Sequence, residues 1–247
     1  MKRVKTGVVG LDVLLNGGLP EGRTVMVAGQ CGTGKTMLAY HFIHQAFRDH
    51  HPSLLITLEQ SKDKVIADAK EIGIDLAAME KAGKLRIVGG SFGNLQYFKD
   101  KARAKVQDLV AEIGEILKES GAKHVAVDSV NLLTMLFDQD SERRIILSSL
   151  IYILEEAGCT SLLTCEVPED SRRFGWFGFE EFMVDGVVSL SRKPFDGNIE
   201  RTITVIKMRG SAHSAGVRAM EIRDKGLVVY PDQEPASVRL TKHAFER

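Results

Sequence analysis

One glycine-rich segment constrains the fold more than any other feature of the chain: Gly29-Gln30-Cys31-Gly32-Thr33-Gly34-Lys35-Thr36. It has the pattern G-x-x-x-x-G-K-[ST], whose glycines allow a tight turn that points successive N–H groups at a phosphate. Residues 24–28 before it are apolar and predict a buried strand, and residues 37–48 after it predict a helix. A strand, a phosphate-binding loop and a helix in this order favour an α/β fold.

The residues of this segment predict the contacts that a nucleotide would make. The helix N-terminus favours negative charge, and the turn aims main-chain donors at it. Lys35 is expected to reach the β- and γ-phosphates, and the Thr36 hydroxyl is expected to hold Mg²⁺. The alternative is a glycine-rich turn that carries Lys-Thr by chance.

Length and charge narrow the class of protein. The 247 residues are enough for one large α/β domain, so a single domain over residues 1–247 is expected. Lys and Arg total 33, and so do Asp and Glu, which leaves a formal charge of zero. The basic footprint of a dedicated nucleic-acid binder is therefore absent.

Other sequence signals favour the cytosol. No segment approaches the roughly 18 apolar residues of a membrane span, and the N-terminus lacks the apolar centre of a signal peptide. Cys31, Cys159 and Cys165 lack CxxC spacing and indicate neither a disulfide framework nor a zinc site.

Strands and helices are predicted to alternate along most of the chain. The strands are expected at 24–28, 54–58, 85–88, 125–127 and 161–164. The helices are expected at 37–48, 62–72, 76–81, 99–119 and 142–157. This order predicts a parallel sheet covered by helices on both faces. Apolar runs at 187–190, 201–208, 219–222 and 227–230 have no helix between them and predict antiparallel hairpins that extend the same sheet.

Two carboxylates follow predicted strands. Asp128 is expected to support Mg²⁺, although an aspartate in this place can also cap a turn. Glu59 ends the strand after the loop helix and is the candidate for polarising the attacking water. Right-handed crossovers would place it at the same sheet edge as the loop, but a solvated strand-end carboxylate is the alternative.

Lys207 and Arg209 stand two residues apart at the end of a predicted strand. Alternation along a strand would put them on the face that carries Ile203 and Val205. Spacing alone favours a solvated strand end.

Several motifs together resemble the KaiC domain of the RecA/RadA superfamily of P-loop NTPases. The resemblance spans residues 4–231 and rests on the following segments: TGVVGLDVLLNGGLP at 6–20, the glycine-rich loop, LEQS at 58–61, VDS at 127–129, FEEF at 179–182 with Asp185, and KMRGSAH at 207–213. A single-domain relative is expected, because the clock protein KaiC carries two such domains.

The resemblance implies a RecA-like core that assembles into a ring, with six copies expected, and that binds ATP or ADP with Mg²⁺ between neighbouring subunits. Residues 32–37, which end with Met37, then match contacts to the subunit's own nucleotide. Lys207, Arg209, Ser211 and His213 match residues that reach the neighbour's nucleotide. Lys207 and Arg209 would act on its γ-phosphate, and Asp224 would lie near its adenine and ribose.

The chain departs from the family pattern at two places. Glu59-Gln60 stands where the family often has Glu-Glu, so the residue matching the catalytic carboxylate is kept and its acidic neighbour is lost. Glu181-Phe182 stands where the phosphorylating half of KaiC has Ser-Thr, which rules out self-phosphorylation there.

Three functions remain open from the sequence. The first is a slow, ring-forming ATPase that drives a conformational or partner-binding cycle. The second is a RecA-like ATPase that handles nucleic acid, against which the neutral charge counts. The third is a nucleotide-sensing scaffold that hardly turns over.

Overall fold

Buried strands with almost continuous apolar sequence form the centre of one large sheet. The computed structural model describes residues 1–89, 102–169, 171 and 173–239. Within these residues the sheet has nine strands. In spatial order they are β11 (Gly226–Tyr230), β10 (Arg218–Arg223), β9 (Asn198–Met208), β8 (Gly186–Phe195), β3 (Thr24–Gly29), β7 (Thr160–Glu166), β6 (His124–Asp128), β4 (Ser53–Thr57) and β5 (Leu85–Gly89).

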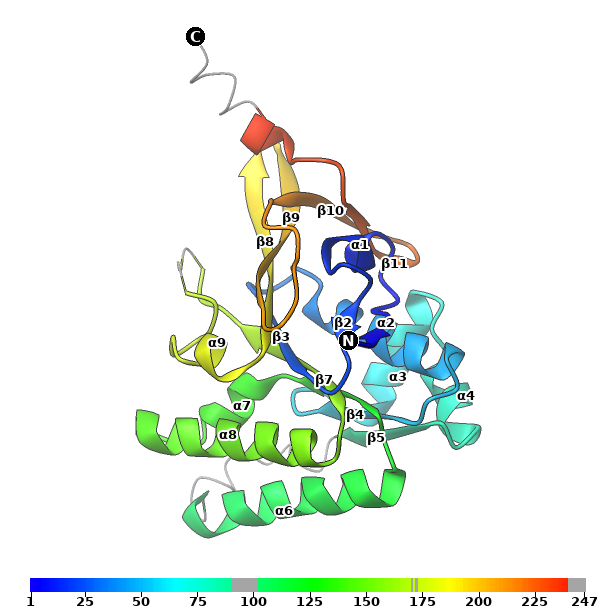
Figure 1. Cartoon of the computed structure of the whole chain (residues 1–247), viewed down its shortest axis with the longest axis vertical. Helices are drawn as coiled ribbons and strands as arrows, with labels where there is room; N and C mark the ends of the chain where they lie inside the picture. Colours follow the sequence, from blue (N-terminus) through cyan, green and yellow to red (C-terminus); the bar gives the residue numbers. More distant parts are fainter. Residues whose placement is uncertain (90–101, 170, 172, 240–247) are drawn as a thin grey trace.

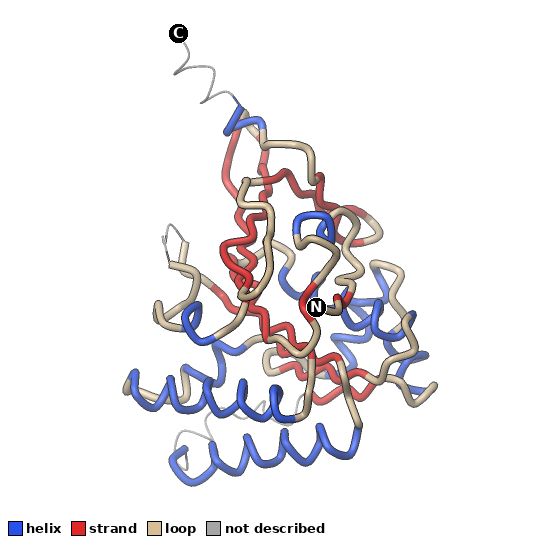
Figure 2. Tube along the Cα trace, in the orientation of Figure 1, coloured by secondary structure: helices blue, strands red, loops and turns tan. Residues whose placement is uncertain are grey.

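Helices cover both faces of the sheet, as the sequence predicts (Figures 1 and 2). One face packs against α2 (Lys35–Arg48), α3 (Lys62–Glu71) and α4 (Leu76–Lys81). The opposite face packs against α6 (Ala102–Ser120), α7 (Val130–Thr134) and α8 (Asp140–Glu156). The parallel strands β3, β4, β6 and β7 are buried on both sides, which explains why their sequences do not alternate between apolar and polar residues.

The predicted elements between residues 24 and 88 agree closely with the structure, and α4 has the predicted bounds. The predicted start of the helix at 99–119 lies outside the described residues, and the described helix α6 begins at Ala102. Short elements escape the periodicity analysis because they contain too few residues to show a period. These are β1 (Arg3–Val4), α1 (Leu11–Leu14), β2 (Leu19–Pro20), α7 and α9 (Glu180–Met183).

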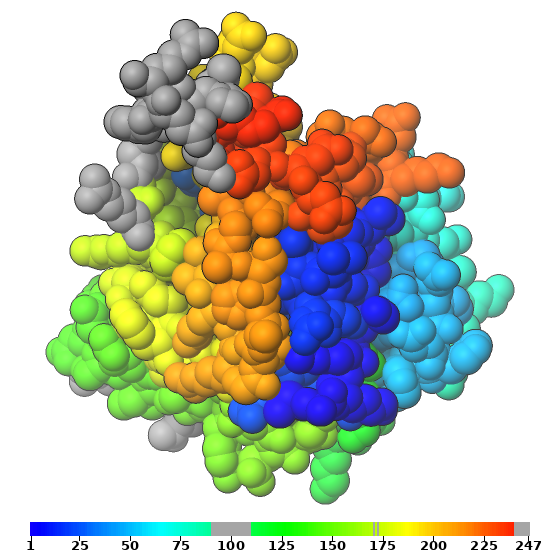
Figure 3. Space-filling view, turned by 45° about the horizontal axis from the view of Figure 1, so that its top comes forward, coloured from blue at the N-terminus to red at the C-terminus, as the bar shows by residue number. Residues whose placement is uncertain are grey.

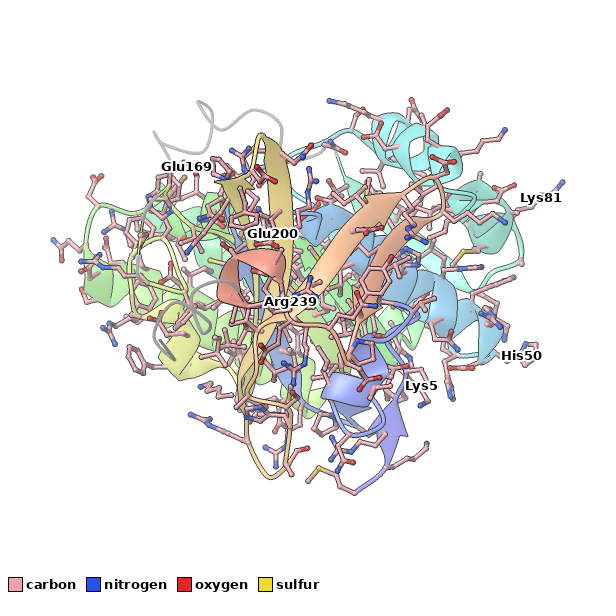
Figure 4. All side chains as sticks on the ribbon, turned by 90° about the horizontal axis from the view of Figure 1, so that it is seen from above. Lys5, His50, Lys81, Glu169, Glu200 and Arg239 are labelled. Carbon is pink, nitrogen blue, oxygen red and sulfur yellow. The ribbon has the colours of Figure 1, made fainter. Side chains whose placement is uncertain are left out.

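The C-terminal strands form antiparallel hairpins that extend the same sheet, as the sequence predicts. β8 is antiparallel to β9 on one side and parallel to β3 on the other, so it joins the parallel and antiparallel parts of one sheet. β9, β10 and β11 then continue in antiparallel order. At the far end of the β8–β9 hairpin, Glu200 accepts hydrogen bonds from the main-chain N–H groups of Ala236 and Ser237 at 2.6 and 3.4 Å. Figure 4 labels Glu200 beside the segment that ends at Arg239.

A bulge in β9 makes the predicted position of Lys207 wrong. Val205 pairs with Val188, but Lys207 pairs with Val187, so Ile206 is an extra residue in the ladder. Directly paired residues share a face of a sheet. Val188 and Val205 lie in the core under α2, whereas Val187 lies in the core under α8. Lys207 therefore lies on the face opposite Val205.

The N-terminal segment lies beside the loop that follows β9 (Figure 3). Arg3 donates from Nη2 to Ser211 Oγ at 2.6 Å and from Nη1 to the carbonyl of Gly18 at 3.2 Å. Ser214 N donates to the carbonyl of Leu14 at 2.9 Å. Segments far apart in the sequence thus meet at the end of the sheet where β3 begins. None of the helices in the described part of the chain is long and apolar enough to cross a bilayer.

Candidate phosphate-binding site

The glycine-rich loop connects β3 to α2 at the carboxyl edge of the parallel strands. Gly32 and Gly34 have φ of 71° and 100°, a conformation that favours glycine because other residues clash there. A Cβ on Gly29 would lie 2.6 Å from both the carbonyl oxygen of Leu190 and Thr33 Oγ1. The three glycines therefore permit the turn and the close packing of the loop against β8.

Lys35 folds over the loop that precedes it. Its Nζ donates to the carbonyls of Gly29 and Gln30 at 2.9 and 3.0 Å, and Thr33 Oγ1 donates to the carbonyl of Gln30 at 2.8 Å. The ammonium group is therefore held against the first two residues of the loop. This is the position from which a lysine can contact a phosphate held by the loop.

Thr36 and Asp128, the two predicted magnesium ligands, come together from α2 and β6. Thr36 Oγ1 donates to Asp128 Oδ2 at 2.9 Å, and Thr164 on β7 donates to Asp128 Oδ1. Asp128 is 7% exposed. Burial raises the pKa of its carboxyl, while the hydrogen bonds from Thr164 and Thr36 lower it. Three neighbouring elements thus converge on one buried carboxylate.

These residues fit a magnesium ion that is shared with a nucleotide. Thr36 and Asp128 supply hydroxyl and carboxylate oxygens, which Mg²⁺ prefers. Among the described residues, no group of three or more His, Cys, Asp and Glu could hold a metal alone. Mg²⁺ commonly takes one or two protein oxygens and completes its shell with phosphate and water. A bound ion would also offset the desolvation of Asp128.

Glu59 lies at the same edge of the sheet. Leu58 N donates to the carbonyl of Asp128 at 2.7 Å, which fixes the chain just before Glu59. Ser129 Oγ donates to Glu59 Oε1, so the residue after Asp128 orients the carboxylate. Glu59 itself is exposed. The structure thus brings the predicted base next to the predicted metal ligand.

A cavity of about 290 Å³ opens beside the loop. It is bounded on the far side by the segment after β7 and by β8. Its lining comprises Gly29, Gln30, Val167, Ser171, Arg173, Phe174, Ser189, Leu190 and Ser191. Cys31 and Gly32 are exposed at the tip of the loop, and Met37 is partly buried in α2.

Sequence reasoning missed three arginines near this edge. Arg192 on β8 pairs directly with Arg201 on β9, and Arg218 lies on neighbouring β10. Leu190, which pairs with Gly29, lies two residues before Arg192, so the arginines extend just beyond the loop. In the part of the chain described here, all three Nε atoms are buried without a hydrogen-bond partner.

An acidic residue partly compensates this charge. Glu169, labelled in Figure 4, accepts from Arg192 Nη2 at 2.8 Å. Arg192 and Arg201 lie directly opposite each other, an arrangement of like charges that is unfavourable in a sheet. Because Glu169 compensates them only in part, the surface close to the loop is positively charged. Their separation in sequence from the loop explains why no motif revealed them.

Lys207 and Arg209 lie at the opposite end of the strands, where β3 begins. Arg209 N donates to the carbonyl of Asp185 at 2.8 Å, and Asp185 N donates to the carbonyl of Thr24 at 2.9 Å. Thr24 and Gly29 are the two ends of β3. At about 3.3 Å per residue, the five steps between them span about 16 Å. A side chain at this end cannot reach a phosphate in its own loop.

Ser211 and Asp224 lie at opposite ends of the strands. Ser211 is held by Arg3 beside the start of β3, and His213 Nδ1 lies 3.3 Å from the carbonyl oxygen of Ser214 in the same loop. Asp224 lies in the turn between β10 and β11.

The β10–β11 hairpin packs on the subunit's own loop helix. A Cβ on Gly34 would lie 2.8 Å from Leu227 Cδ2, and Leu227 N donates to His41 Nε2 at 3.2 Å. The structure therefore places Asp224 at the phosphate-loop edge, whereas the resemblance groups it with Lys207 and Arg209.

Comparison with known proteins agrees with this geometry. The family described as ATPase: KaiC matches residues 4–234. The chain belongs to the KaiC ATPase family. A UPF0273 protein of Thermotoga maritima is 36% identical over 239 residues, covering 94% of this chain and 98% of the relative. A UPF0273 protein of Pyrococcus horikoshii is 34% identical, with 94% and 95% covered.

A solved structure confirms the fold. The crystal structure of a KaiC-like protein from Pyrococcus horikoshii superimposes with a TM-score of 0.81 at 32% identity. The match covers 93% of this chain and 99% of that one. KaiC family membership supports a P-loop ATPase and implies nucleotide binding. The RecA-like fold expected from the sequence is thereby confirmed.

Proposed function

We propose that this KaiC family protein is a slow, Mg²⁺-dependent ATPase whose nucleotide lies between two copies of the chain. The observation that carries the proposal is the placement of Lys207 and Arg209 at the sheet edge opposite the phosphate loop. Neither cation can serve its own loop across the length of β3. Each would serve the loop of a neighbouring copy.

The loop edge supplies binding and water activation. Main-chain N–H groups and Lys35 would hold the phosphates, and Thr36 with Asp128 would hold Mg²⁺, which supplies charge neutralisation when bound. Glu59 is exposed and oriented by Ser129, so it can polarise a water molecule. Arg201 and Arg192 add positive charge at this edge.

The opposite edge supplies charge for the transition state. A cation delivered by a neighbour can raise the rate of phosphoryl transfer by about 10³-fold or more. Phe182 is 67% exposed, and its carbonyl accepts from Arg209 Nη2 at 3.2 Å. An exposed aromatic ring beside the arginine suits a surface that a second copy covers.

Two different edges that fit each other make a head-to-tail contact, which produces a ring when the rotation closes. We propose a homo-oligomeric ring, with six copies as the expected number. Hydrolysis would change the contact between copies and so drive a conformational or regulatory cycle. A neutral chain offers no electrostatic reason to expect nucleic acid as the partner.

A mixing experiment tests the placement of the nucleotide. Lys35→Ala removes the charge facing the phosphates, and Arg209→Ala removes the charge given to the neighbour. Each variant alone should lose nearly all ATP turnover. Mixed rings contain interfaces between an intact loop and an intact Arg209, so the mixture should recover turnover.

Arg86→Ala is the matched control, because among the described residues the Arg86 guanidinium pairs with Glu119 on the surface. It should hydrolyse ATP like the unmodified protein. Mixed with either variant, it should add turnover only in proportion to its own fraction of the subunits. Subunit exchange is followed by energy transfer between labelled copies. A mixture that exchanges subunits and stays as inactive as its parents would show that Arg209 does not act across an interface.

A further inference from the structure

Three carboxylates are buried among the described residues: Asp128, Glu180 and Asp185. Asp128 belongs to the phosphate-binding site. Glu180 accepts from the main-chain N–H groups of Phe177 and Phe179, both at 3.0 Å, and so closes the turn before α9. Asp185 has no role in either place, although it is only 4% exposed. A buried charge needs a compensating partner, so its contacts indicate what it does.

The main chain of Asp185 connects β3 to the segment that carries Arg209. Its N–H donates to the carbonyl of Thr24, and its carbonyl accepts from Arg209 N. Its side chain repeats the connection. Oδ2 accepts from Thr24 N at 3.2 Å, Oδ1 accepts from Arg23 Nη1 at 3.1 Å, and Arg209 Nη1 lies 3.8 Å from the same Oδ1.

Arg209 needs such a counter-charge because a second cation lies close to it. Burial and then the charge of Arg209 lower the pKa of Lys207, while Asp185 and Glu181 raise it. The Arg209 side chain is 56% exposed, and within the described residues its other hydrogen bond goes to the carbonyl of Phe182. Repulsion from Lys207 would turn a loosely held guanidinium toward water.

We propose that Asp185 is a positioning residue that holds the Arg209 guanidinium at the protomer surface in the orientation presented to the neighbour's nucleotide. The inference rests on the proposed function. Asp185 would not touch nucleotide itself. Its carboxylate balances Lys207 and Arg209, and its anchored backbone connects Arg209 to the first residue of β3.

Asp185→Asn tests the charge while it preserves the shape. The amide oxygen can still accept from Thr24 N, but the negative charge facing Arg209 is gone. A displacement of about 1 Å in a catalytic group can cost on the order of 10²-fold in rate. We expect turnover to fall by about 10- to 100-fold, with affinity for a fluorescent ATP analogue unchanged, because the variant's own loop is intact.

Mixing separates a positioning role from a general structural one. Lys35→Ala subunits carry an intact Asp185 and Arg209, so they should restore turnover to the loops of Asp185→Asn subunits. Arg209→Ala subunits offer no such residue and should restore none. Arg23→Gln is the matched control, since it removes the other guanidinium on Oδ1 and should leave turnover within about twofold of the unmodified protein.

The outcomes distinguish the two proposals. If Arg209→Ala keeps full turnover, the proposed function fails. If Arg209→Ala is inactive and Asp185→Asn is fully active, the positioning role of Asp185 is wrong. The role is also wrong if Asp185→Asn loses analogue binding, if Lys35→Ala subunits do not restore it despite exchange, or if Arg23→Gln is equally impaired. Should Asp185→Asn not fold, Asp185→Glu retains the charge one methylene further out, and the same pattern of restoration is expected.

Discussion

The buried carboxylate of Asp128 shows how single residues bring the site together. Thr36, Asp128 and Thr164 come from α2, β6 and β7, and two hydroxyls donate to the two carboxylate oxygens. The carboxylate therefore lies at a junction that no one segment could build. Its neighbour Ser129 then orients Glu59 from β4. A change at any of these positions should alter chemistry before it alters the fold.

Glu59→Gln should slow ATP hydrolysis and spare ATP binding. The amide keeps the size of the side chain but polarises water poorly, and a group that acts mainly in the transition state affects turnover rather than binding. We expect a loss of about 10²- to 10⁴-fold in turnover. Single-turnover hydrolysis and analogue binding measure the two effects separately.

The matched control for Glu59 is Glu166→Gln at the end of β7. Glu166 is held at the same edge through its main chain, by paired hydrogen bonds with the amide of Asn131 at 2.6 and 3.2 Å. Its substitution should leave turnover close to normal. Normal turnover in Glu59→Gln together with a large loss in Glu166→Gln would move the base to Glu166.

Cys31 gives a direct report of occupancy of the loop. It is exposed, whereas Cys159 and Cys165 are buried, and burial raises their pKa to about 11 and about 12. In the native protein, thiol reagents should therefore modify Cys31 alone. Mg-ATP should slow that modification, because phosphate would lie against the loop.

The buried cysteines are unsuitable as parallel labelling controls, because reagents do not reach them in the native protein. They instead report unfolding, since they should react only in denaturant. Equal modification of Cys31 with and without Mg-ATP, in protein whose other two thiols stay protected, would argue against the loop as the binding site.

At the scale of elements, long-range pairing decides what the sequence could not predict. The strand, loop and helix from Thr24 to Arg48 follow from local pattern, and the parallel crossover then places Glu59 and Asp128 at the same edge. Two-residue alternation predicts the wrong face for Lys207, because a bulge depends on how β9 pairs with β8. Thr164 is an unremarkable strand residue until its pairing places it beside Asp128. The opposite positions of Ser211 and Asp224 likewise depend on the reversal of direction between β9 and β10.

The contact between α2 and β11 should make stability depend on pH. His41 Nε2 accepts from Leu227 N, which requires a neutral ring, and burial lowers the pKa of His41 from 6.5 to about 4. The unfolded chain therefore binds more protons between these values. The contribution of His41 is fully present above pH 6.5 and is lost as the pH falls toward 4.

His41→Gln keeps an acceptor in this place but cannot be protonated. Urea unfolding at pH 7.5 and pH 5 should show that the unmodified protein loses more stability than the variant, by on the order of 1–2 kcal/mol. The matched control is His50→Gln, on the exposed turn after α2. The same loss of stability in the unmodified protein and in His41→Gln would contradict a neutral, buried His41.

At the scale of the whole molecule, the two edges of the sheet have different chemistry. One carries the loop, Glu59 and the arginines of β8 and β9, and the other carries Lys207, Arg209 and the exposed Phe182. The proposed contact between copies would join these two unlike ends of the sheet. The proposed assembly can therefore be tested without measuring chemistry.

Phe182→Asp should weaken assembly while the fold and the loop stay intact. Phe182 is 67% exposed, so a carboxylate in its place costs little in the monomer, but that carboxylate would be buried in the proposed contact. Light scattering with Mg-ATP should show smaller particles than for the unmodified protein, and turnover should fall in parallel. Tyr152→Asp, on the exposed face of α8 at 61% exposure, is the control that should assemble normally. Equal particle mass for both variants would place the contact elsewhere.

The length of β3 also determines how many complete sites an assembly can have. If each copy contributes half a site at either end of this strand, a single copy has none, and an open row of n copies has n − 1. At one end of every such row a phosphate loop has no neighbouring Arg209, and at the other end an Arg209 has no neighbouring loop. Closing the row into a ring joins these two halves, so n copies then have n sites. Activity per copy would fall gradually on dilution if rows form, because rows shorten one copy at a time. If rings form, activity per copy would stay constant and then fall sharply, because opening one contact converts a ring into a row that has lost one complete site.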